Sequence, residues 1–309
     1  MGECIVEELH LFIVNPYAGK GKEQATLPER IRVAAQELGV EAAVCIPAHP
    51  GDTREAIARA AAGGRPLRVY ACGGDGTVNE TVNAAAPFEN VSVGIYPCGS
   101  GNDYVKSLPV DVALCRDLKA LMLGEICRMD LVDVDGELCC NMTNIGFDAL
   151  VAHRMRLFRR IPFVTGPLAY SLAVVAGVVS RMSWSVKAIF DDGEEIVGPF
   201  MLCAAGVGRV CGGKYMALPT AKLNEGIMDV CMLRQVPRRR FPALIGIYKA
   251  GQHLADPRVA GIVTYRRCKN LKLILDRPAA RAVDGEIIKG TEFNLQIRPG
   301  ALRLILPKA

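Results

Sequence analysis

The chain has 309 residues, 50% of them hydrophobic and 22% charged, with a formal net charge of +5. This is an ordinary globular composition, and the length suffices for about two domains. Its twelve cysteines form no CxxC pair and no histidine flanks them at zinc-ligand spacing, so we interpret them as reduced core thiols. No basic-then-apolar leader precedes Leu9, and we therefore expect a cytoplasmic rather than a secreted protein.

In the first third of the chain, apolar runs alternate with helical patterns. Strands are predicted at residues 9–14, 67–72 and 91–96, followed by helical patterns that run to about Leu38, over residues 78–86, and from Tyr104 onward. Strands that alternate with helices are typical of βαβ units and a parallel sheet. The sequence therefore predicts an N-terminal Rossmann-like α/β domain, at residues 1–128.

From about Met129 the pattern changes to strands separated by turns. Strands are predicted within residues 131–147, 184–205, 228–236, 271–276, 281–290 and 293–297, with one helix at residues 242–254. This pattern favours a mostly antiparallel second domain, a β-sandwich at residues 129–297. The expected fold class is thus α/β with two domains.

Positive charge is concentrated in three places beside apolar residues. These clusters are residues 153–162, 237–241 and 265–269. They suit an anionic membrane surface or a nucleic acid, and we expect the membrane surface, contacted peripherally, and no nucleic acid. Residues 163–180 carry no charge, but the stretch is shorter than the ~20 residues of a spanning helix and contains Gly166-Pro167, so a buried or interfacial helix is expected.

Three unusual loops each leave a predicted strand and enter a helical pattern. They read NPYAGKGK at residues 15–22, GGDGTVNE at 73–80 and PCGSGND at 97–103. In open α/β sheets ligands bind beyond the carboxyl ends of the strands, and a glycine loop that opens a helix presents N–H groups to an anion. Turns need glycine anyway, so one such loop would indicate little. Three together predict a nucleotide-phosphate pocket.

Asp75 stands among these glycines, where a bound phosphate would repel it. A carboxylate suits this position if Mg²⁺ lies between it and the phosphates, or if it handles a proton of the incoming nucleophile. Both explanations indicate phosphoryl transfer. No GxGxxG follows the first strand and GKGK lacks the GxxxxGK[ST] spacing, which argues against an ordinary dehydrogenase or P-loop NTPase.

These motifs resemble a known family. GGDGT at residues 73–77, NPxxG at 15–19 and PxGxGND at 97–103 are similar to the diacylglycerol kinase catalytic domain, and most of all to its soluble bacterial lipid kinase branch, which is related to sphingosine and ceramide kinases. The resemblance continues through GPLAY at residues 166–170, PTAKLNEGIMDV at 219–230 and VDGE at 283–286. It therefore covers nearly the whole chain.

The resemblance implies an ATP-dependent lipid kinase of phospholipid metabolism. It would transfer the γ-phosphoryl group of ATP to a lipid hydroxyl, most simply converting diacylglycerol to phosphatidic acid at the inner face of the membrane. The tail at residues 298–309 would fold back onto the first domain, and a homodimer is possible in this family. Other acceptors stay open: phosphatidylglycerol or a sphingoid base, or a soluble acceptor as in an NAD kinase. A silent nucleotide-binding sensor is a further alternative.

The resemblance also assigns roles to residues of this chain. ATP would contact Asn15, Pro16, Tyr17, Ala18, Gly19, Gly73, Gly74, Asp75, Gly76, Thr77, Val78, Asn79, Glu80, Gly99, Ser100, Gly101, Asn102 and Asp103. Asp75 would lie close to the phosphates and to a catalytic Mg²⁺, and Glu286 or Asp284 would be the base for the lipid hydroxyl. A structural Mg²⁺ would be held by the side chain of Glu225 and the main-chain carbonyls of Lys222 and Ile227.

Some positions depart from the family pattern. Glu225 stands where the family usually has aspartate, Ser100 replaces a usual threonine, and Pro47 occupies the place of a threonine that contacts ATP. The triplet DGE occurs three times, and Asp-Gly between apolar runs predicts a hairpin turn. We expect plain turns at Asp135 and Asp192, and a functional triplet only at residues 284–286.

Overall fold

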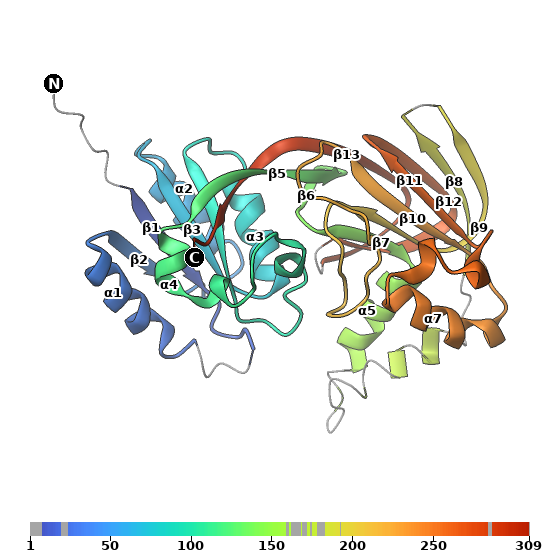
Figure 1. Ribbon diagram of the computed structural model, residues 1–309, viewed down its shortest axis with the longest axis horizontal. Coiled ribbons are helices and arrows are strands. Elements are labelled where there is room, and N and C mark those ends of the chain that lie inside the picture. Colours follow the sequence, from blue (N-terminus) through green and yellow to red (C-terminus); the bar gives the residue numbers. More distant parts are fainter. Residues whose placement is uncertain are drawn as a thin grey trace. The chain divides into compact units, whose positions relative to one another are not determined.

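The computed structural model describes residues 8–19, 24–158, 161, 168, 172–173, 175–177, 183–191, 193–283 and 286–308. The chain forms two compact units: a first unit of Met1–Leu131 with Pro299–Ala309, and a second unit of Val132–Arg298. Both are seen in Figure 1. The first is built on a parallel sheet with helices and the second on antiparallel strands, so the predicted fold class is confirmed.

The first unit contains a parallel sheet with the strand order β4-β3-β1-β2. These strands are β1 (Leu9–Val14), β2 (Glu41–Cys45), β3 (Leu67–Gly73) and β4 (Val91–Pro97). β1, β3 and β4 are buried along almost their whole length, as expected of parallel strands covered on both faces. The end of β13 (Glu286–Leu306) continues the sheet, because Leu304 pairs in parallel with Val93 of β4.

Helices cover this sheet. They are α1 (Leu27–Leu38), α2 (Asp52–Ala61), α3 (Asp75–Ala85) and the short α4 (Leu118–Met122). α1 has a proline in its first turn and ends at Gly39, whose φ of 67° is the left-handed conformation that glycine adopts readily. The core joins buried Leu27 and Ile31 of α1 with Phe12 and Tyr70 of the sheet.

The helix expected from Tyr104 onward is wrong beyond a single turn. Residues Tyr104–Ser107 form a 3₁₀ helix, and Leu108 is extended at φ −67° and ψ 150°. Pro109 follows directly, and a proline disfavours the helical conformation of the residue before it. The third loop therefore leads into a short turn and not into a long helix.

The second unit is antiparallel throughout its recorded pairings. Its strands are β6 (Glu137–Cys139), β7 (Met142–Gly146), β8 (Trp184–Phe190), β9 (Glu195–Gly206), β10 (Met228–Arg234), β11 (Val263–Cys268) and β12 (Asn270–Val283), and β5 (Glu125–Val134) and β13 run between the units. β9 and β12 each pair with both β7 and β8. These four strands form a closed ring of pairings around an apolar interior.

Two helices lie against one face of this unit. α5 (Phe147–Phe158) and α7 (Phe241–Lys249) are side by side in Figure 1, and both pack on side chains of β9 and β10. Phe147 and Phe241 join them through an edge-to-face contact with ring centroids 5.0 Å apart. The helix expected at residues 242–254 is α7 followed by the 3₁₀ turn Gln252–Leu254.

The described residues of the first two Asp-Gly triplets lie in hairpin turns. Asp135 and Gly136, with φ of 52° and 89°, connect β5 to β6, and Gly193 lies in the turn from β8 to β9. Asp192 itself is outside the described residues. At the third triplet, Val283 of β12 pairs with Glu286 of β13, and Asp284 and Gly285 between them are outside the described residues.

Most of the uncharged stretch 163–180 lies outside the described residues, as do Gly166 and Pro167. The expectation of a buried or interfacial helix there stays a prediction. Among the helices that the structure describes, none combines the length and the apolar composition that crossing a bilayer requires.

Candidate functional site

The loops after β1, β3 and β4 leave the same edge of the parallel sheet. β1 connects to β2 on one side and β3 connects to β4 on the other, so the direction of winding reverses between β1 and β3. Such a reversal opens a crevice beyond the carboxyl ends of the two strands, where ligands of this fold class bind. Residues 20–23 of the first loop are outside the described part of the chain.

Hydrogen bonds from Asn15 join the first loop to the second. Its Nδ2 donates to the hydroxyl of Thr77 at 2.9 Å, and its Oδ1 accepts the N–H of Tyr17 at 2.9 Å. The backbone N–H of Asn15 donates to the carbonyl of Cys72 at 3.1 Å. One asparagine at the end of β1 thus fixes its own loop and the first turn of α3.

Asp75 joins the second loop to the third. Its Oδ1 accepts the backbone N–H of Asp103 at 2.5 Å and that of Tyr104 at 3.4 Å. Asp103 is buried and forms an ion pair with Lys106 at 3.1 Å. From the sequence alone, only a bound metal or a proton transfer explained a carboxylate at this position. The structure adds a third reason, because Asp75 positions the GSGND loop through its backbone.

The glycines of the second and third loops lie too close together for side chains. A Cβ atom on Gly99 would lie 2.3 Å from the Cα of Gly74, and one on Gly101 would lie 2.6 Å from Oδ2 of Asp75. Asn102 has a left-handed φ of 52°, and its side chain closes the turn by accepting from the N–H of Gly99 at 3.0 Å and donating to the Gly99 carbonyl at 2.9 Å. Close approach is therefore what these glycines provide.

The expected nucleotide contacts divide by exposure. Tyr17, Gly19, Gly76, Glu80 and Ser100 are exposed, Asn15, Pro16, Gly74, Asp75, Gly99, Gly101 and Asn102 are half-buried, and Ala18, Gly73, Thr77, Val78, Asn79 and Asp103 are buried. The first two groups form the accessible part of the site. Val78 is a core residue of α3. Asn79 is 8% exposed, and its carbonyl and its side-chain Oδ1 accept hydrogen bonds from Nδ2 of Asn83. Both residues therefore lie on the inner side of the helix.

This arrangement can bind an anion. α3 begins after Gly74, which has no side chain to cap the helix, and the positive end of its dipole suits a ligand such as a phosphate. Asp75 is a half-exposed carboxylate at this end and offers the hard oxygen that Mg²⁺ prefers, together with phosphate oxygens and water. The residues therefore fit an ion held between Asp75 and nucleotide phosphates.

The expected base lies at the hairpin between β12 and β13. Asp284 is outside the described residues, and for Glu286 only the backbone is described, paired with Val283. Their role as base stays a prediction.

The residues expected to hold a structural Mg²⁺ do not fit that ion. Lys222 Nζ donates to Oε1 of Glu225 at 2.5 Å, and Arg267 Nη2 donates to Oε2. These two hydrogen bonds hold the pKa of Glu225 below its usual range, with Lys222 the larger cause. Both oxygens of the expected ligand thus face a positive side chain.

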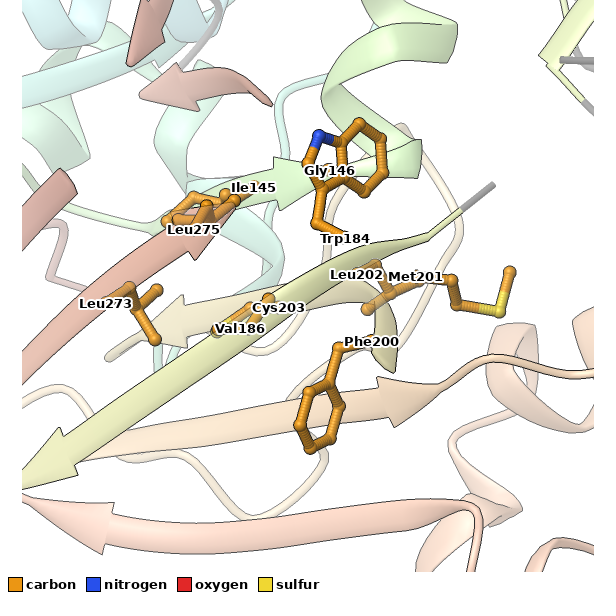
Figure 2. Close-up of a pocket in the computed structure, with 10 residues that line it drawn as sticks. All are labelled: Ile145, Gly146, Trp184, Val186, Phe200, Met201, Leu202, Cys203, Leu273 and Leu275. Atoms are coloured by element: carbon orange, nitrogen blue, oxygen red, sulfur yellow. The ribbon is translucent and has the colours of Figure 1, made fainter. Parts of the chain in front are cut away.

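An apolar cavity lies inside the ring of β7, β8, β9 and β12. Figure 2 shows its lining by Ile145, Gly146, Trp184, Val186, Phe200, Met201, Leu202, Cys203, Leu273 and Leu275. Its volume is about 10 Å³, roughly the room of one water molecule. It is a packing gap and cannot take an acyl chain.

Sequence reasoning missed several charged groups of the second unit. Asp229 and Arg281 are 1% and 3% exposed, and Asp148 at the start of α5 has its pKa raised to about 6 by burial. Asp229 pairs with Arg267, and Arg281 with Asp135. Their partners are distant in sequence, so only the position of Asp229 within an apolar strand could have signalled a buried charge.

Residues 10–134 match the diacylglycerol kinase catalytic domain, and residues 141–306 match the YegS C-terminal NAD kinase beta sandwich-like domain. A Pseudomonas aeruginosa protein named "Probable lipid kinase YegS-like" is 29% identical over 296 residues, 93% of this chain and 92% of that protein. The Bacillus subtilis diacylglycerol kinase is 26% identical over 306 residues, 96% and 95% of the two chains. A crystal structure of a Bacillus anthracis diacylglycerol kinase shares the fold, with a TM-score of 0.70 at 18% identity over 98% of both chains. The chain belongs to the lipid kinase family in which a diacylglycerol kinase catalytic domain precedes a YegS C-terminal domain.

Proposed function

We propose that the protein transfers the γ-phosphoryl group of ATP to the hydroxyl of diacylglycerol and so produces phosphatidic acid. The relatives named diacylglycerol kinase support this acceptor. The observation that carries the proposal is the meeting of three glycine-rich loops at the reversal point of the parallel sheet, fixed by Asn15, Asp75 and Asn102. Such a site suits the phosphates of a nucleotide.

Each part of the site has a task in this reaction. N–H groups of the loops and of the α3 N-terminus bind the phosphate oxygens, and the Asp75 carboxylate keeps the third loop in place. A bound Mg²⁺ would offset negative charge on the transferred phosphoryl group, and Asp75 is the residue that would hold it. Glu286 or Asp284 accepts the proton of the lipid hydroxyl. The protein acts chiefly by positioning.

The kinase proposal is tested by ATP consumption on mixed micelles that each contain one candidate lipid. Diacylglycerol, phosphatidylglycerol and a sphingoid base are compared with NAD as a soluble acceptor. Asp75→Asn and Glu286→Gln proteins are measured beside the unaltered protein. We expect turnover on diacylglycerol, reduced at least ~100-fold in both variants.

Each other outcome points elsewhere. Turnover on another lipid keeps the kinase and changes the acceptor, and turnover on NAD contradicts a lipid kinase. ATP binding without turnover on any acceptor would indicate a nucleotide-binding sensor. Full activity of Glu286→Gln on diacylglycerol would move the base to Asp284.

A second proposal concerns the membrane. In the second unit, Arg238, Arg239 and Arg240 are exposed in a 3₁₀ turn ahead of α7. Apolar side chains between residues 157 and 175 are also exposed, namely Leu157, Ile161, Leu168, Leu172 and Val175. Exposed apolar side chains and arginines on one unit suit the surface of an anionic membrane, where the protein would bind peripherally.

Vesicle sedimentation tests this contact. Binding is expected to rise with anionic lipid content, to fall with salt, and to weaken when Arg238, Arg239 and Arg240 are changed to Gln. Changing three exposed arginines of the first unit, Arg32, Arg54 and Arg59, to Gln removes the same charge and serves as the control. Equal binding by both triple variants would contradict the proposed surface.

A further inference from the structure

A buried carboxylate lies where β10 meets β11. Asp229 is 1% exposed, and its pairing partner across the two antiparallel strands is Arg267. Arg267 Nε donates to Oδ1 of Asp229 at 3.0 Å. A buried charge destabilises a fold unless an opposite charge and hydrogen bonds satisfy it. Arg267 supplies the opposite charge from the neighbouring strand.

The second oxygen of Asp229 is satisfied by hydroxyl groups. Tyr265 donates to Oδ2 at 2.6 Å and Thr220 donates to it at 2.8 Å. Burial, and next its hydrogen bond to Asp229, raises the pKa of Tyr265 far above its usual range, so this hydroxyl keeps its proton. Asp229 is thus fully engaged by groups of this chain.

The same guanidinium extends to the loop before β10. Arg267 Nη2 donates to Glu225, whose other oxygen accepts from Lys222. Two carboxylates, Asp229 and Glu225, are therefore balanced by two cations, Arg267 and Lys222. A divalent ion added to this cluster would leave an excess of positive charge, and to bind Glu225 it would have to compete with Lys222 or Arg267 for a carboxylate oxygen.

We propose that Arg267 takes the place of the structural Mg²⁺ in this chain, and that its guanidinium clamps the loop at Glu225 to the buried end of β10. The planar fork of arginine suits this task, because two of its N–H groups reach two carboxylates at once. The second unit then folds without a metal. The inference concerns stability, so it stands apart from the proposed kinase activity.

Chemical unfolding of the full chain without nucleotide tests the proposal. Trp184 is the single tryptophan and lies in the second unit, where it is 7% exposed, so its fluorescence reports on that unit. We expect the same unfolding midpoint in EDTA and in millimolar Mg²⁺. A midpoint that falls in EDTA and recovers with Mg²⁺ would overturn the proposal.

Variants supply the second arm, read by thermal unfolding with the same fluorescence. Arg267→Met should lower the midpoint by at least ~5 °C, since it leaves Asp229 buried without its cation. Arg267→Lys keeps the positive charge but not the planar fork, so its midpoint should lie between those of the unaltered protein and Arg267→Met. If Arg267→Met does not fold, Arg267→Lys still tests the proposal. Arg266→Met is the matched control: its neighbouring exposed pair with Glu194 should matter little. Equal midpoints for Arg266→Met and Arg267→Met would overturn the clamp.

Discussion

The two units hold their buried polar groups with different kinds of interaction. In the first unit, loops are held together by backbone groups and short side chains, as where Asp75 accepts the N–H of Asp103 and Gly99 lies against Gly74. In the second unit, buried charges are balanced across strands, as for Asp229 with Arg267. The difference implies that the first unit is sensitive to added volume at its loops, and the second to removed charge.

Arg281→Met, in the second unit, should give the largest loss in the free energy of unfolding. Arg281 is 3% exposed, and its guanidinium donates to Asp135 at 2.8 Å, to Glu137 at 3.2 Å and to the Val134 carbonyl at 3.1 Å. Removing one partner of a buried network lowers the free energy of unfolding by about 3–5 kcal/mol. Urea unfolding followed by Trp184 fluorescence measures it.

The control for this charge is Arg298→Met. Arg298 pairs with Asp133 at 2.8 Å, but its side chain is 49% exposed. An exposed pair contributes about 0–1 kcal/mol. Equal losses for Arg281→Met and Arg298→Met would mean that charge balance is not what holds the second unit.

Gly99→Ala should give the next largest effect and falls on the first unit. A methyl group there would lie 2.3 Å from the Cα of Gly74, so one loop must move. We expect a loss of about 2–3 kcal/mol in the free energy of unfolding. Amide hydrogen exchange in β3 and β4 measures the stability, and calorimetry with ATP should show weaker binding.

Substitutions at two further glycines distinguish an effect on ATP binding from an effect on stability. Gly76 and Gly63 both have open space where a Cβ would stand, but Gly76 lies at the exposed start of α3 and Gly63 lies away from the loops. Gly76→Ala should weaken ATP binding without loss of stability, and Gly63→Ala should change neither. If Gly99→Ala leaves exchange in β3 and β4 unaltered, close approach of the loops is not a requirement of the fold.

The sequence predicted best what its own neighbours determine. β1, β3 and β4 are mostly apolar runs, and their predicted bounds differ from the structure by one residue at most. β2 was missed because EAAVC is a short, alanine-rich edge strand, mostly exposed. β11 was interpreted only as a basic cluster, because the adjacent Arg266 and Arg267 break the apolar–polar alternation that indicates a strand. α2 and α5 were not predicted either.

In the candidate site, too, the features set by local sequence were predicted and the contacts between distant residues were not. The glycines of residues 73–80 and 97–103 predicted loops that a ligand can approach closely, and in the structure Gly99 and Gly101 have no room for a side chain. The partner of Asp75 is an amide 28 residues later, and the partner of Asp229 is an arginine 38 residues later. No local pattern encodes such contacts. They follow from strand order and register, which place distant residues side by side.

Acid should destabilise the first unit. His10 is buried in β1 against the hydroxyl of Tyr70 at 2.9 Å, and burial together with the positive charge of Arg68 lowers its pKa to about 4. The unfolded chain then binds the proton first, so stability is lost as pH falls from about 6.5 toward 4. The expected loss between pH 7 and pH 5 is about 2 kcal/mol. His10→Phe should remove this slope in hydrogen exchange of β1, and His49→Phe, at an exposed position, should not; an unchanged slope in His10→Phe would contradict the assignment.

The second unit should respond in the opposite direction, with the smallest effect. Burial raises the pKa of Asp148 to about 6, so between pH 4 and pH 6 the folded chain holds a proton that the unfolded chain has released. Stability is then present at low pH and lost as pH rises through about 6, by about 1 kcal/mol between pH 5 and pH 7.5, since the residue keeps some exposure to water. Asp148→Asn should remove this slope from the Trp184 transition, and the exposed Glu195→Gln should leave it. If the unaltered protein and Glu195→Gln instead gained stability in the Trp184 transition from pH 5 to pH 7.5, Asp148 would be ionised in the folded unit. The opposite responses of the two units would then have no basis in these two buried groups.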